Sequence, residues 1–145
     1  MDPQLRTFSI QEANQLIPIL APLLIELQGK QKQAIDLETQ IDALELISEP
    51  GGENAALELN RLVERHHARV TEFYAIADEI HSHGCLLKDV ELGLIDFYAL
   101  LDEKAVYLCW KLGEKKVGHW HEVGKGYAAR EPILPSSEIE GKGQD

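Results

Sequence analysis

Two histidines separated by one residue, His119 and His121, are the side chains best suited to chemistry in this sequence. If their segment is a strand, both point to the same face. Two imidazoles can bind one divalent metal ion when a carboxylate completes the set, and Asp96 and Glu114 are the candidates for that carboxylate. These four residues are the candidate metal site. The alternative is that His119 is exposed and that His121 forms a hydrogen bond within a sheet.

A metal-dependent hydrolase would also need a general base, and Glu122 is the carboxylate nearest to the histidines. Strict alternation points Glu122 away from His121, so this version of the site requires a bulge in the strand. The sequence contains no GxSxG, P-loop, HExxH or GxGxxG motif that would name another reaction.

Aromatic and basic side chains near the histidines suggest a second kind of site. Trp110 and Trp120 either pack in the core or form an aromatic wall for a ligand. Five of the fourteen basic residues are concentrated here: Lys111, Lys115, Lys116, Lys125 and Arg130. Lys88 and Arg130, together with the two tryptophans, would bind a small anionic ligand; the alternative is that the lysines are solvated turn residues.

Composition limits the partners and the compartment. The chain has 145 residues and a formal net charge of -11, which disfavours a nucleic acid partner. No apolar run approaches a membrane span, and the N-terminus lacks the pattern of a signal peptide. Cys85 and Cys109 form no CxxC pair, so we expect two reduced, buried thiols in a soluble cytoplasmic protein.

Two long helices are predicted before the histidine segment, at about 9–47 and 54–83. Ser9 and Glu12 form a capping box at the start of the first helix. Pro18 and Pro22 predict a kink or a break in its early turns. The turn SEPGGEN separates the helices, which must then pack antiparallel.

Heptad-like series predict the seam of this helical hairpin. The first helix repeats Leu20, Leu27, Ala34 and Ile41, together with Leu23, Leu37 and Leu44. The second repeats Ala56, Val63, Val70 and Ala77, together with Leu59, His66, Phe73 and Ile80. Lys30 and His66 interrupt the stripes, and we expect them to lie at the edge of the seam or to bond locally.

The period of the pattern changes to two after Gly84. The segments LIDFYAL, AVYLCWKL and VGHWHEV predict an antiparallel β-meander of three strands over about 85–123, with a fourth edge strand near CLLKD. The predicted fold class is therefore α+β: a long antiparallel helical hairpin followed by a small three- to four-stranded sheet. Residues 1–134 are expected to form a single domain, and 135–145 a flexible acidic tail.

The motifs FSIQEANQLIPIL, GCLLKDVELGLIDF and VYLCWKLGE, followed by HWHE and GYAAR, resemble an uncharacterised prokaryotic family, domain of unknown function 2203, over about residues 6–133. The resemblance implies a bacterial cytosolic protein and brings no activity. It also implies that certain polar residues belong to the family pattern, among them Asp96, Glu114, His121 and Arg130. His119 does not clearly belong to that pattern, which weakens the paired-histidine metal site.

Three functions are compatible with these patterns. The first is a non-enzymatic binding or scaffold module that self-associates as a homodimer, because a two-helix hairpin leaves one flank uncovered. The second is a metal-binding protein or metal-dependent hydrolase that uses His121, Asp96 and Glu114. The third is a sensor of a small anionic metabolite.

Overall fold

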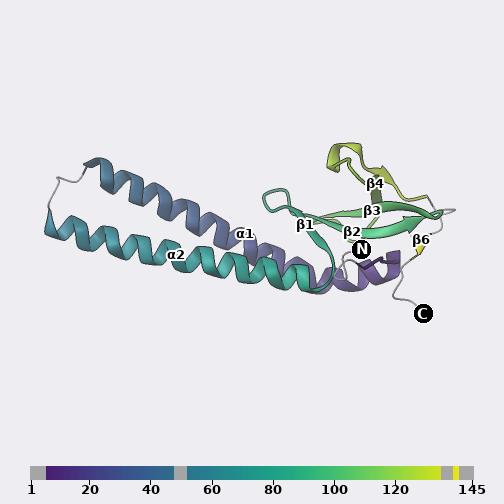
Figure 1. Ribbon diagram of the computed structural model, residues 1–145, viewed down its shortest axis with the longest axis horizontal. Helices are drawn as coiled ribbons and strands as arrows, with labels where there is room; N and C mark the ends of the chain where they lie inside the picture. The colour runs from purple at the N-terminus through teal and green to yellow at the C-terminus, as the bar shows by residue number, and fades with distance from the viewer. Residues whose placement is uncertain (1–5, 48–51, 135–138, 141–145) are drawn as a thin grey trace. The chain divides into compact units, whose positions relative to one another are not determined.

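The computed structural model describes residues 6–47, 52–134 and 139–140. Two helices, α1 (Ile10–Ile47) and α2 (Glu53–Ser82), precede an antiparallel sheet, so the predicted α+β class is confirmed (Figure 1). The chain divides into two compact units, of which one is the helical hairpin Ile25–Ala77. The other combines the residues up to Leu24 with those from Asp78 onward. Neither helix is long and apolar enough over its described residues to cross a membrane.

The capping box opens α1 as predicted. The Glu12 amide donates to Ser9 Oγ over 3.1 Å, and the Ser9 amide donates to Glu12 Oε1 over 2.8 Å. The helix continues without a break through Pro18 and Pro22. Both prolines are exposed, so water can bond to the carbonyls that lose their helical partners.

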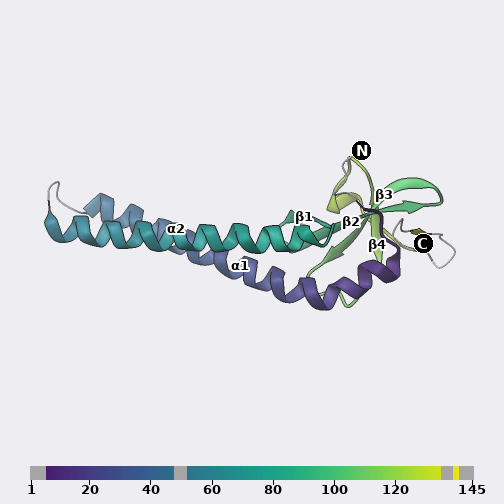
Figure 2. The same ribbon diagram turned by 60° about the horizontal axis from the view of Figure 1, so that its bottom comes forward.

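In the hairpin unit, α1 and α2 run antiparallel beside each other (Figures 1 and 2). Leu27 and Leu37 of α1 are 0% and 4% exposed, as the predicted seam requires. On α2 the prediction for Val63 is wrong, because Val63 is 48% exposed and Leu62 only 5%, whereas Ala77 of the same series is buried. The series through Leu62 is Ala55, Leu62, Arg69 and Ile76, and Arg69 interrupts it, so the apolar pattern favoured the series through Val63.

The two polar residues of the seam form ion pairs across the hairpin. Lys30 Nζ lies 3.1 Å from Glu72 Oε1, which also receives Arg69 Nε at 2.8 Å. His66 Nε2 lies 3.2 Å from Glu38 Oε1. Partly exposed ion pairs of this kind contribute about 1 kcal/mol or less each to stability. They allow polar residues at the seam and add little to the stability of the hairpin.

The sheet has the strand order β1-β2-β3-β4-β5, and β6 pairs with β2. The strands are β1 (Leu86–Asp89), β2 (Leu94–Leu101), β3 (Lys104–Lys111), β4 (His119–Glu122), β5 (Glu131–Pro132) and β6 (Ile139–Glu140). The first four are the predicted meander with its edge strand, and two strands of two residues extend it. Most of the predicted tail, at 135–138 and 141–145, lies outside the described residues.

The two faces of the sheet differ in character. One face is apolar and almost fully buried, with Ile95, Phe97, Ala99, Val106, Leu108 and Trp110 all at 0–1% exposure. The Phe8 ring packs edge-on against Phe97 at 5.1 Å between centroids. The opposite face carries polar and aromatic side chains: Asp96, Tyr98, Tyr107, Cys109, His119 and His121. The candidate site lies on this second face.

Candidate functional site

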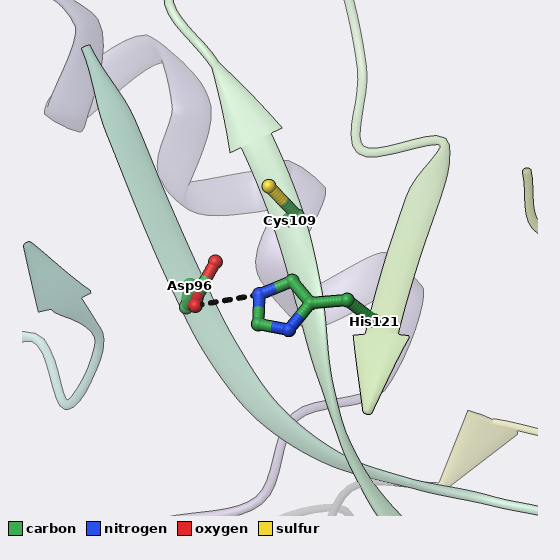
Figure 3. Close-up of side chains that lie close together, drawn as sticks. All are labelled: Asp96, Cys109 and His121. Carbon is green, nitrogen blue, oxygen red and sulfur yellow. Dashed lines mark hydrogen bonds and ion pairs between the residues drawn. The ribbon is translucent and has the colours of Figure 1, made fainter. Parts of the chain in front are cut away.

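Three neighbouring strands bring Asp96, Cys109 and His121 together on the polar face of the sheet. The β2–β3 register pairs Asp96 directly with Cys109, and the β3–β4 register places His121 two residues further along the same face. Figure 3 shows the three side chains converging from β2, β3 and β4. Their ligand atoms all lie within 4.8 Å of one another. The residues are only 2%, 1% and 2% exposed, so the cluster is buried.

Hydrogen bonds fix the orientation of the His121 ring. Nδ1 lies 3.0 Å from the Glu122 carbonyl oxygen, and Nε2 lies 2.9 Å from Asp96 Oδ2. A carbonyl oxygen can only accept, so Nδ1 must carry hydrogen and donate. Nε2 is the ring nitrogen that faces Asp96 and Cys109. Metal-binding histidines are commonly held in this way, with the second ring nitrogen donating to a carbonyl or carboxylate.

Burial dominates the electrostatics of the cluster. It raises the pKa of the Asp96 carboxyl, although the charge and hydrogen bond of His121 and the charge of Lys88 act in the opposite direction. Burial and the Asp96 charge raise the pKa of the Cys109 thiol to about 11, against a smaller lowering by Arg130. A thiol with this pKa is protonated at neutral pH and donates to Asp96, so Cys109 alone is not a reactive nucleophile.

Lys88 and Tyr107 lie next to the cluster. The Tyr107 ring centroid is 5.6 Å from that of His121, and Lys88 Nζ is 5.1 Å from the Tyr107 ring centroid. Burial, then the charge of Asp96 and the neighbouring Tyr98, raises the pKa of the Tyr107 hydroxyl. Lys88 thus faces the Asp96 side of the sheet, where its charge favours the carboxylate.

Glu114 and Arg130 form a second polar group. Arg130 donates from both terminal nitrogens to Glu114, at 3.2 Å and 2.7 Å, and the Lys111 amide donates to the same carboxylate at 2.8 Å. Burial raises the pKa of Glu114, but these hydrogen bonds outweigh it and hold the pKa below the ordinary value. His119 Nδ1 lies 3.8 Å from Glu114 Oε2 and has no hydrogen-bond partner among the described residues.

The structure therefore divides the predicted metal residues between two groups. Asp96 and His121 come together, while Glu114 and His119 lie with Arg130. Cys109, which the sequence suggested only as a buried thiol, takes the third position beside Asp96 and His121.

The predicted ligand-binding residues lie on both faces of the sheet. Trp110 is paired with Ile95 and Trp120 with Leu108, so both tryptophans belong to the apolar face. The Trp110 ring is 1% exposed, and its Nε1 donates to the Glu114 carbonyl oxygen at 2.9 Å. Ligand binding by the tryptophans with Lys88 and Arg130 stays a prediction. The tryptophans lie on the apolar face of the sheet, whereas Lys88 lies beside Tyr107 on the polar face.

A family model, DUF2203, described as an uncharacterized conserved protein, matches residues 6–133. The chain belongs to this family. The match confirms the resemblance seen in the sequence motifs, and it includes Asp96, Cys109 and His121. No curated protein and no solved structure matches the chain.

Proposed function

We propose that this protein is a non-enzymatic binding module that holds a divalent transition metal ion, zinc in the first instance, between Asp96, Cys109 and His121. The observation that carries the proposal is the convergence of a carboxylate, a thiol and an oriented imidazole nitrogen within 4.8 Å. Oxygen, sulfur and nitrogen donors of these three residue types are the ones that zinc takes in proteins. Glu114 and His119 are not needed as ligands in this version of the site.

The separations in the cluster fit an ion after a small adjustment. With bonds of about 2.0–2.3 Å, the donor atoms of a tetrahedral zinc ion lie roughly 3.3–3.7 Å apart. The widest separation in the cluster is at most 4.8 Å, and the Asp96–His121 hydrogen bond is 2.9 Å long. The Asp96–His121 pair would open by about 0.4 Å or more and the widest separation would close by up to about 1.1 Å, which side-chain rotation can supply.

The charges also support the proposal. A divalent cation with one carboxylate and one thiolate forms a neutral group, which a buried position tolerates far better than an unbalanced charge. The thiol releases its proton when the ion binds, and the nearby Arg130 favours the thiolate. We further propose that the protein works in a reducing cytoplasm, where Cys109 stays available as a thiol.

We favour ion binding over hydrolysis because of the depth of the site. A substrate must reach a catalytic metal, whereas the three residues are only 1–2% exposed. Glu122, the general base that a hydrolase would need, points from β4 to the other face of the sheet. It pairs there with Lys104 at 3.0 Å.

Elemental analysis of purified protein tests the proposal. The protein is stripped with a chelator, dialysed against Zn²⁺ and then against metal-free buffer, and the bound metal is measured by mass spectrometry. We expect one zinc ion per chain, and we expect cobalt to give the near-ultraviolet absorption of a thiolate–cobalt bond.

Cys85 provides a matched control, because it is also a buried thiol and donates to the Ile80 carbonyl oxygen at 3.3 Å. Cys109→Ser should lose the cobalt–thiolate absorption and most of the zinc, and Cys85→Ser should keep both. Wild-type protein without retained metal, or equal loss in the two serine variants, would overturn the proposal.

A further inference from the structure

The hairpin unit Ile25–Ala77 has two flanks of different chemistry. One is marked by the Glu38–His66 ion pair and will be called the histidine flank. The other contains a groove of about 220 Å³ lined by Gln33, Asp36, Leu37, Gln40, Arg65 and Arg69. Since each residue turns a helix by about 100°, Gln40 and Glu38 point to opposite sides of α1. The arginines therefore lie on the flank away from the His66 pair.

Three of the exposed apolar side chains of the hairpin unit lie on the histidine flank. Ile35 precedes Glu38 by three residues and Val63 precedes His66 by three, so each lies about 60° around its helix from the ion pair. Tyr74 follows Val63 by eleven residues, which is about 20° from the same direction. Ile35, Val63 and Tyr74 are 52%, 48% and 61% exposed. Three large apolar side chains on one side of a two-helix unit leave a surface that association would cover.

The same one-residue shift that placed Leu62 in the seam created this surface. Val63, which was predicted to face α1, instead lies on the outer side of α2 beside His66, with the half-buried Val70 one heptad further along. A second heptad-like strip next to a filled seam is the arrangement by which helical hairpins pair into four-helix bundles.

Charge indicates what covers the flank. Its α1 side carries the carboxylates of Glu38 and Asp42. Its α2 side, at positions 59, 63, 66, 67, 70 and 74, carries two histidines and no carboxylate. A two-fold axis that lays α1 of one copy on α2 of the other brings carboxylates to imidazoles twice, as an isologous contact requires. Laying α1 on α1 would oppose acids to acids in a chain of net charge -11.

The area of the flank is adequate for such a contact. The segment Ile25–Ile47 is about 34 Å long at 1.5 Å per residue, and two adjacent helices are about 20 Å wide. The flank thus offers roughly 700 Å² per copy, close to the ~800 Å² per partner of a standard specific interface.

We propose that a second copy of this chain docks on the histidine flank through Ile35, Val63, Val70 and Tyr74, to give an antiparallel four-helix homodimer. The dimer is independent of the metal site, because both surfaces that it joins lie within the hairpin unit.

Light scattering coupled to size exclusion, on the full chain at micromolar concentrations, tests the dimer. We expect wild-type protein at twice the chain mass, and Val63→Glu and Tyr74→Glu at the chain mass. Gln33→Glu is the matched control, since it adds the same charge at an exposed position on the opposite flank, and it should remain dimeric.

Circular dichroism of each variant verifies that the helices are intact, and Val63→Ser provides a milder change if the glutamate variant unfolds. A monomeric wild type, dimers that persist in both glutamate variants, or equal dissociation of Gln33→Glu would overturn the proposal.

Discussion

Replacing His121 by phenylalanine should expose the energetic role of the buried pair with Asp96. The two side chains are 3% and 2% exposed and 2.9 Å apart. Removing one member of a buried pair costs about 3–5 kcal/mol, because the other is left without its partner. We expect the lower end, about 3 kcal/mol, since burial already raises the pKa of Asp96, which can take up a proton instead of staying charged. The phenyl ring is somewhat larger than the imidazole, so the substitution leaves no cavity.

The assay is a double-mutant cycle in the presence of a chelator, so that no bound metal contributes. Guanidinium unfolding at neutral pH is followed by circular dichroism for wild type, His121→Phe, Asp96→Val and the double variant. The double variant leaves neither member of the Asp96–His121 pair without the other; only the Glu122 carbonyl and the Cys109 thiol lose a partner, so it should unfold within about 2 kcal/mol of wild type. A coupling energy of about 2 kcal/mol or more is therefore expected. The His121→Phe variant should melt about 6–12 °C lower than wild type.

Additive effects of the two substitutions, within about 0.5 kcal/mol, would refute the reasoning, because they would mean that Asp96 and His121 do not act as a pair. Repeating the cycle with Zn²⁺ separates pairing from metal binding. Free zinc at 100 times its dissociation constant should stabilise wild type by about 2.7 kcal/mol and leave the three variants unchanged.

Three further predictions concern other residues of the compact unit that contains the sheet. Ser9→Ala removes the acceptor of the Glu12 amide and should cost about 1 kcal/mol in urea unfolding, whereas Ser9→Asp should restore most of it; equal stability of all three proteins would contradict the capping role. Glu114 has a pKa below 4.5 in the fold, despite the opposing effect of burial, because Arg130 donates to it, so its contribution is present above about pH 4.5 and is lost as the pH falls further. Glu114→Gln should therefore be less stable than wild type at neutral pH and should lose less stability on acidification, as urea midpoints between pH 7 and 3 would show. Parallel stability profiles of the two proteins over this pH range would contradict the role of the Glu114 carboxylate. Gly84 has a φ of +90°, so Gly84→Ala should lower the free energy of unfolding by about 1 kcal/mol or more, measured by thermal melting; an unchanged melting temperature would show that the turn relaxes.

Local signals in the sequence were enough to predict the helices and the meander. The Ser9–Glu12 capping box fixed the start of α1, and alternation in LIDFYAL and AVYLCWKL identified the two long strands. The predicted break at Pro18 and Pro22 is absent, because exposed prolines remove hydrogen bonds without ending a helix that is held by its neighbours.

The cluster on the polar face was predicted only in part. Residue types indicate which side chains can bind a metal ion, whereas the strand register decides which of them lie close together. Asp96 and Cys109 are paired through a two-residue turn in which Asp102 and Glu103 have φ of 49° and 68°. Asp-Glu is not one of the sequences that favour such a turn, so the register, and with it the position of Cys109, could not be read. The sequence also did not show that Arg130 would donate to the Glu114 carboxylate, which places Glu114 apart from Asp96 and His121.

Packing alone does not explain why Asp96, Cys109 and His121 occupy the polar face of the sheet. Apolar side chains of similar volume would stabilise a buried position as well as, or better than, the Asp96–His121 pair. The opposite face of the same two strands is filled in that way, with Ile95, Phe97 and Leu108 at 0% exposure. A carboxylate, a thiol and an imidazole are three different donors at one buried point, and packing requires none of them. If the double variant folds as stably as wild type and binds no metal, the pair is dispensable for the fold, and ion binding is what remains to explain it.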